Sequence, residues 1–137
     1  MMNPISKIFT LLIFISLAGT AQLLPAQDGA KKLSPTEFEV QSKKKKKNVI
    51  LDIRTPEETA EGYIEGATFI DFLSGNFEQE ISKLNKKRTY FVYCRSAKRT
   101  IPATEKMMEM GFKNVYMLEG GINNWKENNK PTKIPEN

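Results

Sequence analysis

The feature that most constrains the fold is the alternation of short apolar runs with helical patterns between residues 34 and 128. The runs are rich in β-branched and aromatic side chains, which is typical of buried strands. They span residues 48–54, 67–72, 89–94 and 114–118. Strands that alternate with helices predict an α/β domain, with a central parallel β-sheet and helices on both faces. In such a fold, ligands bind beyond the carboxyl ends of the strands.

Helices are expected on either side of these strands. Residues 34–37 have the form of a capping box with proline at the first helical position, and residues 55–58 combine a cap, a proline and early acids. Further helices are expected at residues 77–84, 96–110 and 121–128. Ile101, Thr104 and Met108 are expected to share one helix face, and Phe69, Phe72, Phe91 and Trp125 are expected in the core.

The chain of 137 residues is long enough for one domain with its own core. Lys7 precedes an apolar stretch, Ile8 to Ala18, which small residues follow. This pattern predicts a signal peptide at residues 1–21 and export to the periplasm or outside the cell. A membrane anchor is the alternative, but the stretch is short for a span. We expect a linker at 22–33, the domain at 34–131, a frayed C-terminal tail at 132–137, and no stable membrane span after cleavage.

The charge pattern argues against a nucleic-acid partner. The net charge is +5, and much of it comes from the single run Lys43–Lys47. The sequence has no basic stripe interleaved with aromatic residues. The lysine run suits a solvated helix end, where cations complement the helix dipole, and contact with an anionic membrane is the alternative.

Residue counts exclude several kinds of chemistry. The chain has no histidine and a single cysteine, Cys94. Ser-His-Asp catalysis, Cys-His pairs, internal disulfides and histidine or cysteine zinc sites are therefore excluded. We expect no cofactor and no metal, so any reaction must use Cys94, carboxylates, hydroxyls, lysine or arginine.

Cys94 ends an apolar run and opens the segment Cys94-Arg95-Ser96-Ala97-Lys98-Arg99. Three nearby cations and the amides ahead of a helix favour an anion here. The loop could cradle a thiolate, or an oxyanion such as thiosulfate, phosphate or arsenate. Cys94 and Arg54 both end predicted strands, so we expect them to face one crevice. The alternative is that Cys94 is simply a small buried apolar residue.

Four segments in order resemble the rhodanese family, over about Ser34 to Pro131. Any one of them alone is a weak signal, but four at the family's spacing are a strong one. Residues 51–58 resemble the family's DVRxPEE segment, residues 62–67 its GHIPGA segment, residues 94–99 its active loop CRSGxR, and residues 118–125 its LEGGxxxW ending.

The resemblance implies a rhodanese-like α/β fold and a sulfurtransferase reaction. Cys94 would take sulfur from a small donor such as thiosulfate or a persulfide, and would pass it to a thiol or cyanide acceptor. Arg95, Lys98 and Arg99 would neutralise the donor, and the amides of residues 95–99, Ser96 and Ala97 included, would cradle the persulfide. Asp52 and Arg54 are expected to support the site from behind, and the protein is expected to be a monomer.

The sequence departs from the family pattern at several positions. Ala97 stands where many relatives have glycine, which costs about 1 kcal/mol if the position needs a positive φ. Tyr63, Glu65 and Thr59 replace a histidine, a proline and an aromatic residue. These changes leave open a binding module with little turnover. Phosphatase or arsenate chemistry is a third possibility, but only four residues separate Cys94 from Arg99, one fewer than in related phosphatases.

Overall fold

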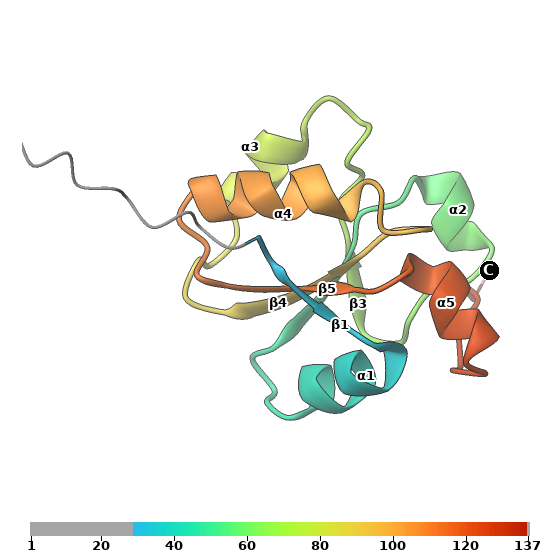
Figure 1. Ribbon diagram of the computed structural model, residues 1–137. Helices are drawn as coiled ribbons and strands as arrows, with labels where there is room; N and C mark the ends of the chain where they lie inside the picture. Colours follow the sequence, from blue (N-terminus) through green and yellow to red (C-terminus); the bar gives the residue numbers. More distant parts are fainter. Residues whose placement is uncertain (1–28, 137) are drawn as a thin grey trace, which may run out of the picture.

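The protein folds around a five-stranded parallel sheet, shown by a computed structural model that describes residues 29–136. The signal peptide expected at residues 1–21 lies outside the described residues. The strand order is β1-β5-β4-β2-β3, and every pairing is parallel (Figure 1). The strands are β1 (Lys31–Leu33), β2 (Val49–Asp52), β3 (Ala67–Phe69), β4 (Thr89–Tyr93) and β5 (Asn114–Leu118).

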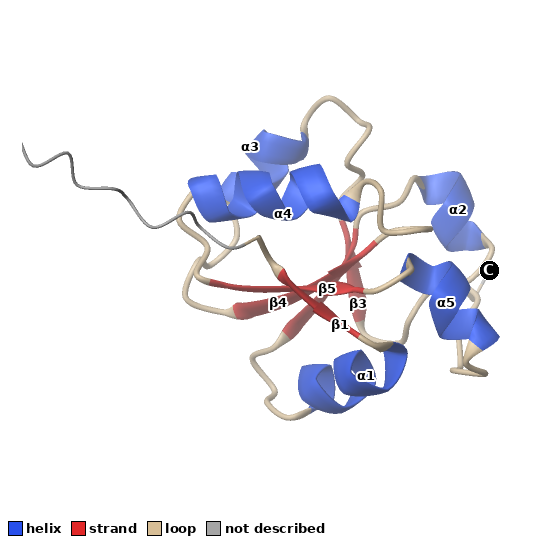
Figure 2. Ribbon diagram, viewed as in Figure 1, coloured by secondary structure: helices blue, strands red, loops and turns tan. Residues whose placement is uncertain are grey.

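The described residues form five helices, α1 to α5, and Figure 2 shows how they lie around the sheet. The capping box predicted at residues 34–37 is present with Ser34 as the N-cap, and the cap predicted at residues 55–58 is also a full capping box, with Thr55 as the N-cap and Glu58 as its partner. Their reciprocal hydrogen bonds satisfy backbone N–H groups that a helix start would otherwise leave unpaired. The helices are α1 (Pro35–Lys43), α2 (Pro56–Ala60), α3 (Phe77–Ser82), α4 (Thr100–Glu109) and α5 (Gly121–Glu127).

Two apolar cores lie on opposite faces of the sheet. On one face, side chains of β2, β4 and β5 pack with α3 and α4 around Ile81 and Met107, both fully buried. On the other face, α1 and α5 supply Phe38 and Trp125, whose rings meet edge to face at 6.2 Å. The predicted α/β fold with helices on both faces and the core position of Trp125 are confirmed.

Several local predictions are wrong at the edges of the elements. The helix expected from residue 96 begins only at Thr100, because residues 95–99 form a loop. Ile101 is 42% exposed and does not share the buried face of Thr104, and Phe69 is 47% exposed rather than in the core. Inward-facing residues of α4 are instead Thr100, Ala103, Thr104 and Met107.

Both ends of the described chain are more ordered than the sequence predicts. Residues 31–33, expected in a linker, form β1 and pair with β5. At the other end, Tyr63 and Lys133 exchange two backbone hydrogen bonds of 2.8 Å. The tail expected to fray is therefore paired to the loop before β3 at Lys133. None of the helices in the described part of the chain combines the length and the apolar character needed to cross a bilayer.

Candidate active site

Cys94 and Arg54 lie side by side because they follow neighbouring parallel strands. Asp52 of β2 pairs in register with Tyr93 of β4, and the Ile53 amide donates to the Tyr93 carbonyl at 3.0 Å. The residues that follow each strand therefore emerge at the same edge of the sheet. This edge is where parallel sheets place their ligand sites, as the sequence predicts for these two residues.

The loop after Cys94 is fastened by the start of α5. The Ile122 amide donates to the Cys94 carbonyl at 2.9 Å, and the Asn123 amide donates to the Arg95 carbonyl at 3.1 Å. Gly121 makes this approach possible. Its φ is +62°, and a Cβ there would lie 2.5 Å from the Arg95 carbonyl. Glycine is required at this position both for its backbone conformation and for the space.

The loop is shaped so that its amides remain open. Ala97 has φ of +73°, so the residue that replaces the family's glycine does adopt the left-handed conformation. The Thr100 hydroxyl donates to the Ala97 carbonyl at 3.0 Å. None of the amides of residues 95–99 donates a hydrogen bond to another residue within 29–136. Unpaired amides around a left-handed residue form a concave, anion-binding arrangement.

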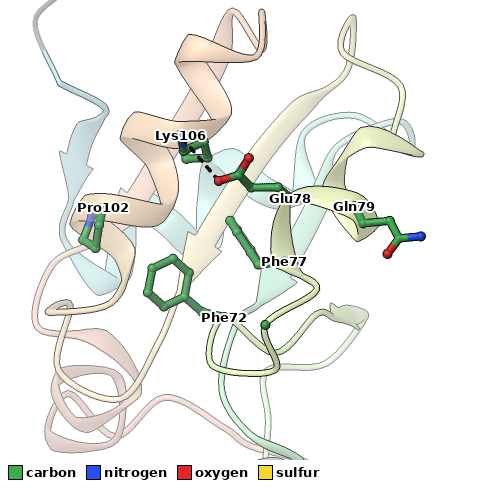
Figure 3. Close-up of a pocket in the computed structure, with 7 residues that line it drawn as sticks. Phe72, Phe77, Glu78, Gln79, Pro102 and Lys106 are labelled. Atoms are coloured by element: carbon green, nitrogen blue, oxygen red, sulfur yellow. Dashed lines mark ion pairs between the residues drawn. The ribbon is translucent and has the colours of Figure 1, made fainter.

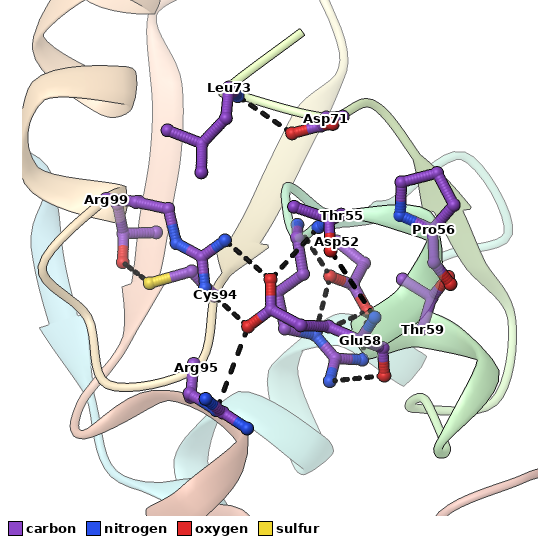
Figure 4. A network of polar contacts seen from close by, with 12 residues as sticks. Asp52, Thr55, Pro56, Glu58, Thr59, Asp71, Leu73, Cys94, Arg95 and Arg99 are labelled. Atoms are coloured by element: carbon purple, nitrogen blue, oxygen red, sulfur yellow. Dashed lines mark hydrogen bonds and ion pairs between the residues drawn. The ribbon is translucent and has the colours of Figure 1, made fainter.

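Cys94 lies at the base of this loop, beneath charged side chains. It is only 1% exposed and belongs to the apolar core around Ile81 and Met107, as the alternative interpretation of a small buried apolar residue predicts, but polar groups also reach its sulfur atom. The Sγ atom is 3.3 Å from the Thr100 hydroxyl, and the Arg99 guanidinium lies beside it (Figure 4). A thiol surrounded by hydroxyl and guanidinium groups is a candidate nucleophile. Its ionisation stays a prediction.

Arg99 is engaged by a carboxylate from α2. Its two terminal nitrogens each donate to one oxygen of Glu58 at 2.7 Å, a bidentate pair of the strongest kind. These bonds lower the pKa of Glu58 to about 2, and the Glu58 contact raises the pKa of Arg99. Arg95, which is largely exposed, approaches the same carboxylate at 3.8 Å. Glu58 thus draws two of the three loop cations together.

Asp52 and Arg54 form a second pair, behind the loop. Arg54 Nη2 lies 2.6 Å from Asp52 Oδ2, and both side chains are buried. Arg54 also donates to the Gly62 and Glu58 carbonyls, at 2.8 and 3.2 Å. It makes no hydrogen bond or ion pair with residues 94–99. The pair therefore positions α2, and through it Glu58, and this fits the supporting role predicted for both residues.

Three residues that shape the loop are not singled out by the sequence patterns. Glu58 falls in the cap-and-acid pattern of residues 55–58, Thr100 follows the 94–99 segment, and Gly121 belongs to the segment that resembles the family's LEGGxxxW ending. Only Gly121 carried a local signal, the paired glycines at 120 and 121. Of the predicted loop residues, Ser96 and Lys98 are exposed and point to no described partner.

A separate hollow lies between α3 and the first turn of α4. It has a volume of about 570 Å³, and Figure 3 shows Phe72, Phe77 and Pro102 around it. Glu78 and Lys106 form an ion pair of 3.3 Å at its rim. No residue of the 94–99 loop lines this hollow, so it is distinct from the site around Cys94.

Comparisons with known proteins agree with this geometry. The family model for the rhodanese-like domain matches residues 34–128. A sulfurtransferase of Allochromatium vinosum is 34% identical, over 64% of this chain and 80% of that protein. The chloroplastic thiosulfate sulfurtransferase 16 of Arabidopsis thaliana is 32% identical, over 61% and 78%. The crystal structure of a rhodanese-like domain protein from Staphylococcus aureus superposes with a TM-score of 0.67 at 26% identity, covering 77% of this chain and 99% of that one. The chain belongs to the rhodanese-like domain family.

Proposed function

We propose that this protein is a rhodanese-type sulfurtransferase that moves sulfane sulfur from an anionic donor such as thiosulfate to a thiol or cyanide. The observation that carries the proposal is the loop of residues 94–99. It places one cysteine at the base of a ring of open amides and beside a guanidinium. Relatives named as sulfurtransferases support sulfur transfer as the class of reaction.

The reaction would run in two displacements on one sulfur atom. The Cys94 thiolate attacks the sulfane sulfur of thiosulfate. A sulfur–sulfur bond forms to the enzyme, the bond to the sulfite group breaks, and sulfite leaves with the electron pair. The acceptor then attacks the terminal sulfur of the Cys94 persulfide. Cyanide leaves as thiocyanate, and the thiolate is restored.

The loop would stabilise the negative charge at each stage. The amides of residues 95–99, which donate to no other described residue, would bind the terminal sulfur of the Cys94 persulfide. Amides fixed in advance by the Ile122 and Asn123 hydrogen bonds need no reorganisation when charge develops. Lys98 and Arg95, both exposed, would attract the anionic donor.

Arg99 would contact the donor only after exchanging its partner. Both of its terminal nitrogens are bonded to Glu58, and Cys94 is buried beside it. An incoming oxyanion would replace the Glu58 carboxylate on the same fork. Glu58 would therefore act as an internal competitor that sets how tightly anionic donors bind.

The test is a turnover assay with thiosulfate and cyanide, in which thiocyanate is measured. The wild-type protein should produce thiocyanate, and Cys94→Ser should not, since a hydroxyl is too weakly acidic to replace the thiolate. Thr104→Ser serves as a control, because Thr104 is buried on α4 away from the loop. Equal rates for wild type and Cys94→Ser would refute the proposal.

A second candidate is an anion-binding module with little turnover. The closed Glu58–Arg99 pair and the left-handed Ala97 favour it, because both could keep Cys94 covered. One titration distinguishes the two functions. A module would bind sulfite or thiosulfate in calorimetry without releasing sulfite, whereas an enzyme would release one sulfite per Cys94.

We also propose that the protein works outside the cytoplasm, on the strength of the signal-peptide pattern at residues 1–21. N-terminal sequencing of protein from the exported fraction should begin near residue 22. Protein recovered only from the cytoplasm, with residues 1–21 intact, would contradict export.

A further inference from the structure

The edge of the sheet opposite Cys94 collects the positive charge of the chain. In a parallel sheet, the segments that precede the strands all meet at one edge. Lys44–Lys47 precede β2, Lys86–Arg88 precede β4 and Lys113 precedes β5. All eight cations are exposed, and we call them the basic edge. Figure 1 shows these three connections on the same side of the sheet, away from α2 and α5.

The positive charge of the basic edge is not neutralised by acids within its own three segments. The segments 44–48, 85–88 and 110–113 contain no acid. The chain as a whole has a net charge of +5, so the remainder of the chain is net −3 once these eight cations are set aside. Three acids on the neighbouring helices already have cationic partners: Glu39 pairs with Lys43 and Lys130, Glu80 with Lys83, and Glu109 with Lys106.

The three segments lie next to one another, because β4 pairs with β2 on one side and with β5 on the other. The Lys86 ammonium lies 6.0 Å from the centre of the Phe112 ring, which joins the segments before β4 and β5. Between the lysine run and the start of β4 there is a hollow of about 160 Å³. Lys44, Lys45, Asn48 and Thr89 line it, with the Tyr116 ring. Two ammonium groups, an amide and a hydroxyl around one hollow suit a phosphate oxyanion.

The form of this surface fits a membrane better than a nucleic acid. Seven of its eight cations are lysines, spread over three loops rather than along a groove that could follow a strand. Of the aromatic residues at this edge, Phe91 and Phe112 are buried, and Tyr116 is half-buried and stacked on Phe91, whereas a nucleic-acid strand needs several open rings for its successive bases.

We propose that the basic edge docks the domain on a membrane with anionic headgroups, as a peripheral contact that leaves the Cys94 edge facing solvent. Clusters of lysines near a surface bind anionic lipid through additive, salt-sensitive attraction. The hollow beside Lys44 and Lys45 takes one headgroup phosphate. This contact does not depend on sulfur transfer, so the vesicle test can fail without affecting the proposed reaction, and the turnover assay can fail without affecting the proposed contact.

The test is co-sedimentation of residues 22–137, the chain expected after removal of the signal peptide, with vesicles of phosphatidylcholine alone or mixed with phosphatidylglycerol. Binding should require phosphatidylglycerol and should be lost in high salt. Lys87→Glu should weaken it about tenfold or more. The matched control is Lys126→Glu, an exposed lysine on α5 at the opposite edge, which should bind like the wild type. Because both variants lack the apolar stretch Ile8 to Ala18, the difference between them measures the basic edge alone.

Three outcomes would overturn the proposal. The first is equal binding of Lys87→Glu and Lys126→Glu, and the second is equal binding to neutral and anionic vesicles. The third is tighter binding to duplex DNA or RNA than to phosphatidylglycerol vesicles at the same salt, which would assign the basic edge to nucleic acid. A second variant at the same surface combines Lys46→Gln with Lys47→Gln and leaves the segment before β4 intact. It should weaken binding to the phosphatidylglycerol vesicles as much as Lys87→Glu does.

Discussion

Two arginine–carboxylate pairs stand at the same edge of the sheet, and they differ in what surrounds them. The Asp52–Arg54 pair is sealed, with side chains 0% and 4% exposed, and its remaining donors reach carbonyls of the chain. The Glu58–Arg99 pair has equally good geometry, but its side chains are 16% and 19% exposed. Arg99 also lies beside Cys94, whereas Arg54 does not touch the loop.

The difference separates a structural pair from an exchangeable one. A sealed pair cannot lose one member without leaving a charge buried and unpaired, so it fixes the structure. A pair at the mouth of a loop can exchange one partner for a substrate anion, because water and the substrate both reach it. The same chemical groups therefore stabilise the fold in one place, and in the proposed reaction they would control how anionic donors reach Arg99 in the other.

The largest effect should come from breaking the sealed pair. Asp52→Asn leaves the Arg54 guanidinium buried without its counter-charge, and should lower the free energy of unfolding by about 3–5 kcal/mol. Urea denaturation followed by circular dichroism measures this. Asp71→Asn, which changes a half-buried carboxylate in a turn, is the control and should change stability by less than about 1 kcal/mol. If Asp52→Asn also changes the free energy of unfolding by less than about 1 kcal/mol, the Asp52–Arg54 pair does not stabilise the fold.

The next effect should fall on activity rather than stability. Arg99→Gln removes the fork that an anionic donor would engage and should lower kcat/KM for thiosulfate about 100-fold. Its stability should change by only about 1 kcal/mol, because the pair is partly exposed. Steady-state thiocyanate production gives kcat/KM, and urea denaturation of the same preparation gives the free energy of unfolding. A variant that loses stability but keeps kcat/KM would reverse the roles assigned to the two pairs.

A smaller and opposite effect is expected for Glu58→Gln. Gln keeps the capping box of α2 but releases Arg99, so the KM for thiosulfate should fall several-fold, and Cys94 should react faster with iodoacetamide. Glu57→Gln is the matched control, since Glu57 is the exposed neighbour on the same helix and forms no ion pair among the described residues. A higher KM in Glu58→Gln than in Glu57→Gln would show that Glu58 assists donor binding instead of competing with it.

The same pair gives a pH signature. The folded pKa of Glu58 is lowered from 4.5 to about 2 by the Arg99 hydrogen bonds. A lowered carboxylate pKa stabilises the folded state above pH 4.5, and this contribution is lost as the pH falls from 4.5 toward 2. The stability difference between wild type and Glu58→Gln, followed by thermal denaturation, should therefore shrink over that interval. A difference that stays constant down to pH 2 would contradict the Glu58–Arg99 contact.

The smallest effect concerns the loop between the two pairs. Ala97 has φ of +73°, a conformation that glycine adopts without strain. Ala97→Gly should raise the free energy of unfolding by up to about 1 kcal/mol, as measured in urea, with little change in the KM for thiosulfate. Destabilisation by Ala97→Gly would indicate that residue 97 has an ordinary helical or extended backbone in the folded protein.

The parts of the fold that local sequence determines were predicted well. The strands β4 and β5 have apolar, β-branched or aromatic runs, and α1 and α2 begin with capping boxes, so each carries its own signal. Strand β1 carries none, because it has three residues and only Leu33 is buried. Its extended form comes from pairing with β5, a contact that no local pattern encodes.

The site was predictable only as far as its loop. Residues 96–99 are compatible with a helix by propensity, and the sequence placed the helix start there. The hydrogen bonds from α5 to the carbonyls of Cys94 and Arg95 instead keep the chain open until Thr100. The Glu58–Arg99 pair joins residues 41 positions apart, so neither periodicity nor spacing could reveal it. Three-dimensional packing alone brings these two side chains together.

Mass spectrometry of Cys94 after treatment with thiosulfate tests the account most directly. The protein should gain the mass of one sulfur atom on the peptide that contains Cys94, release sulfite, and lose the added sulfur when cyanide is supplied. Folded protein that shows neither the mass gain nor sulfite release, at a thiosulfate concentration that saturates binding, would contradict a persulfide on Cys94 and leave the loop as an anion-binding site.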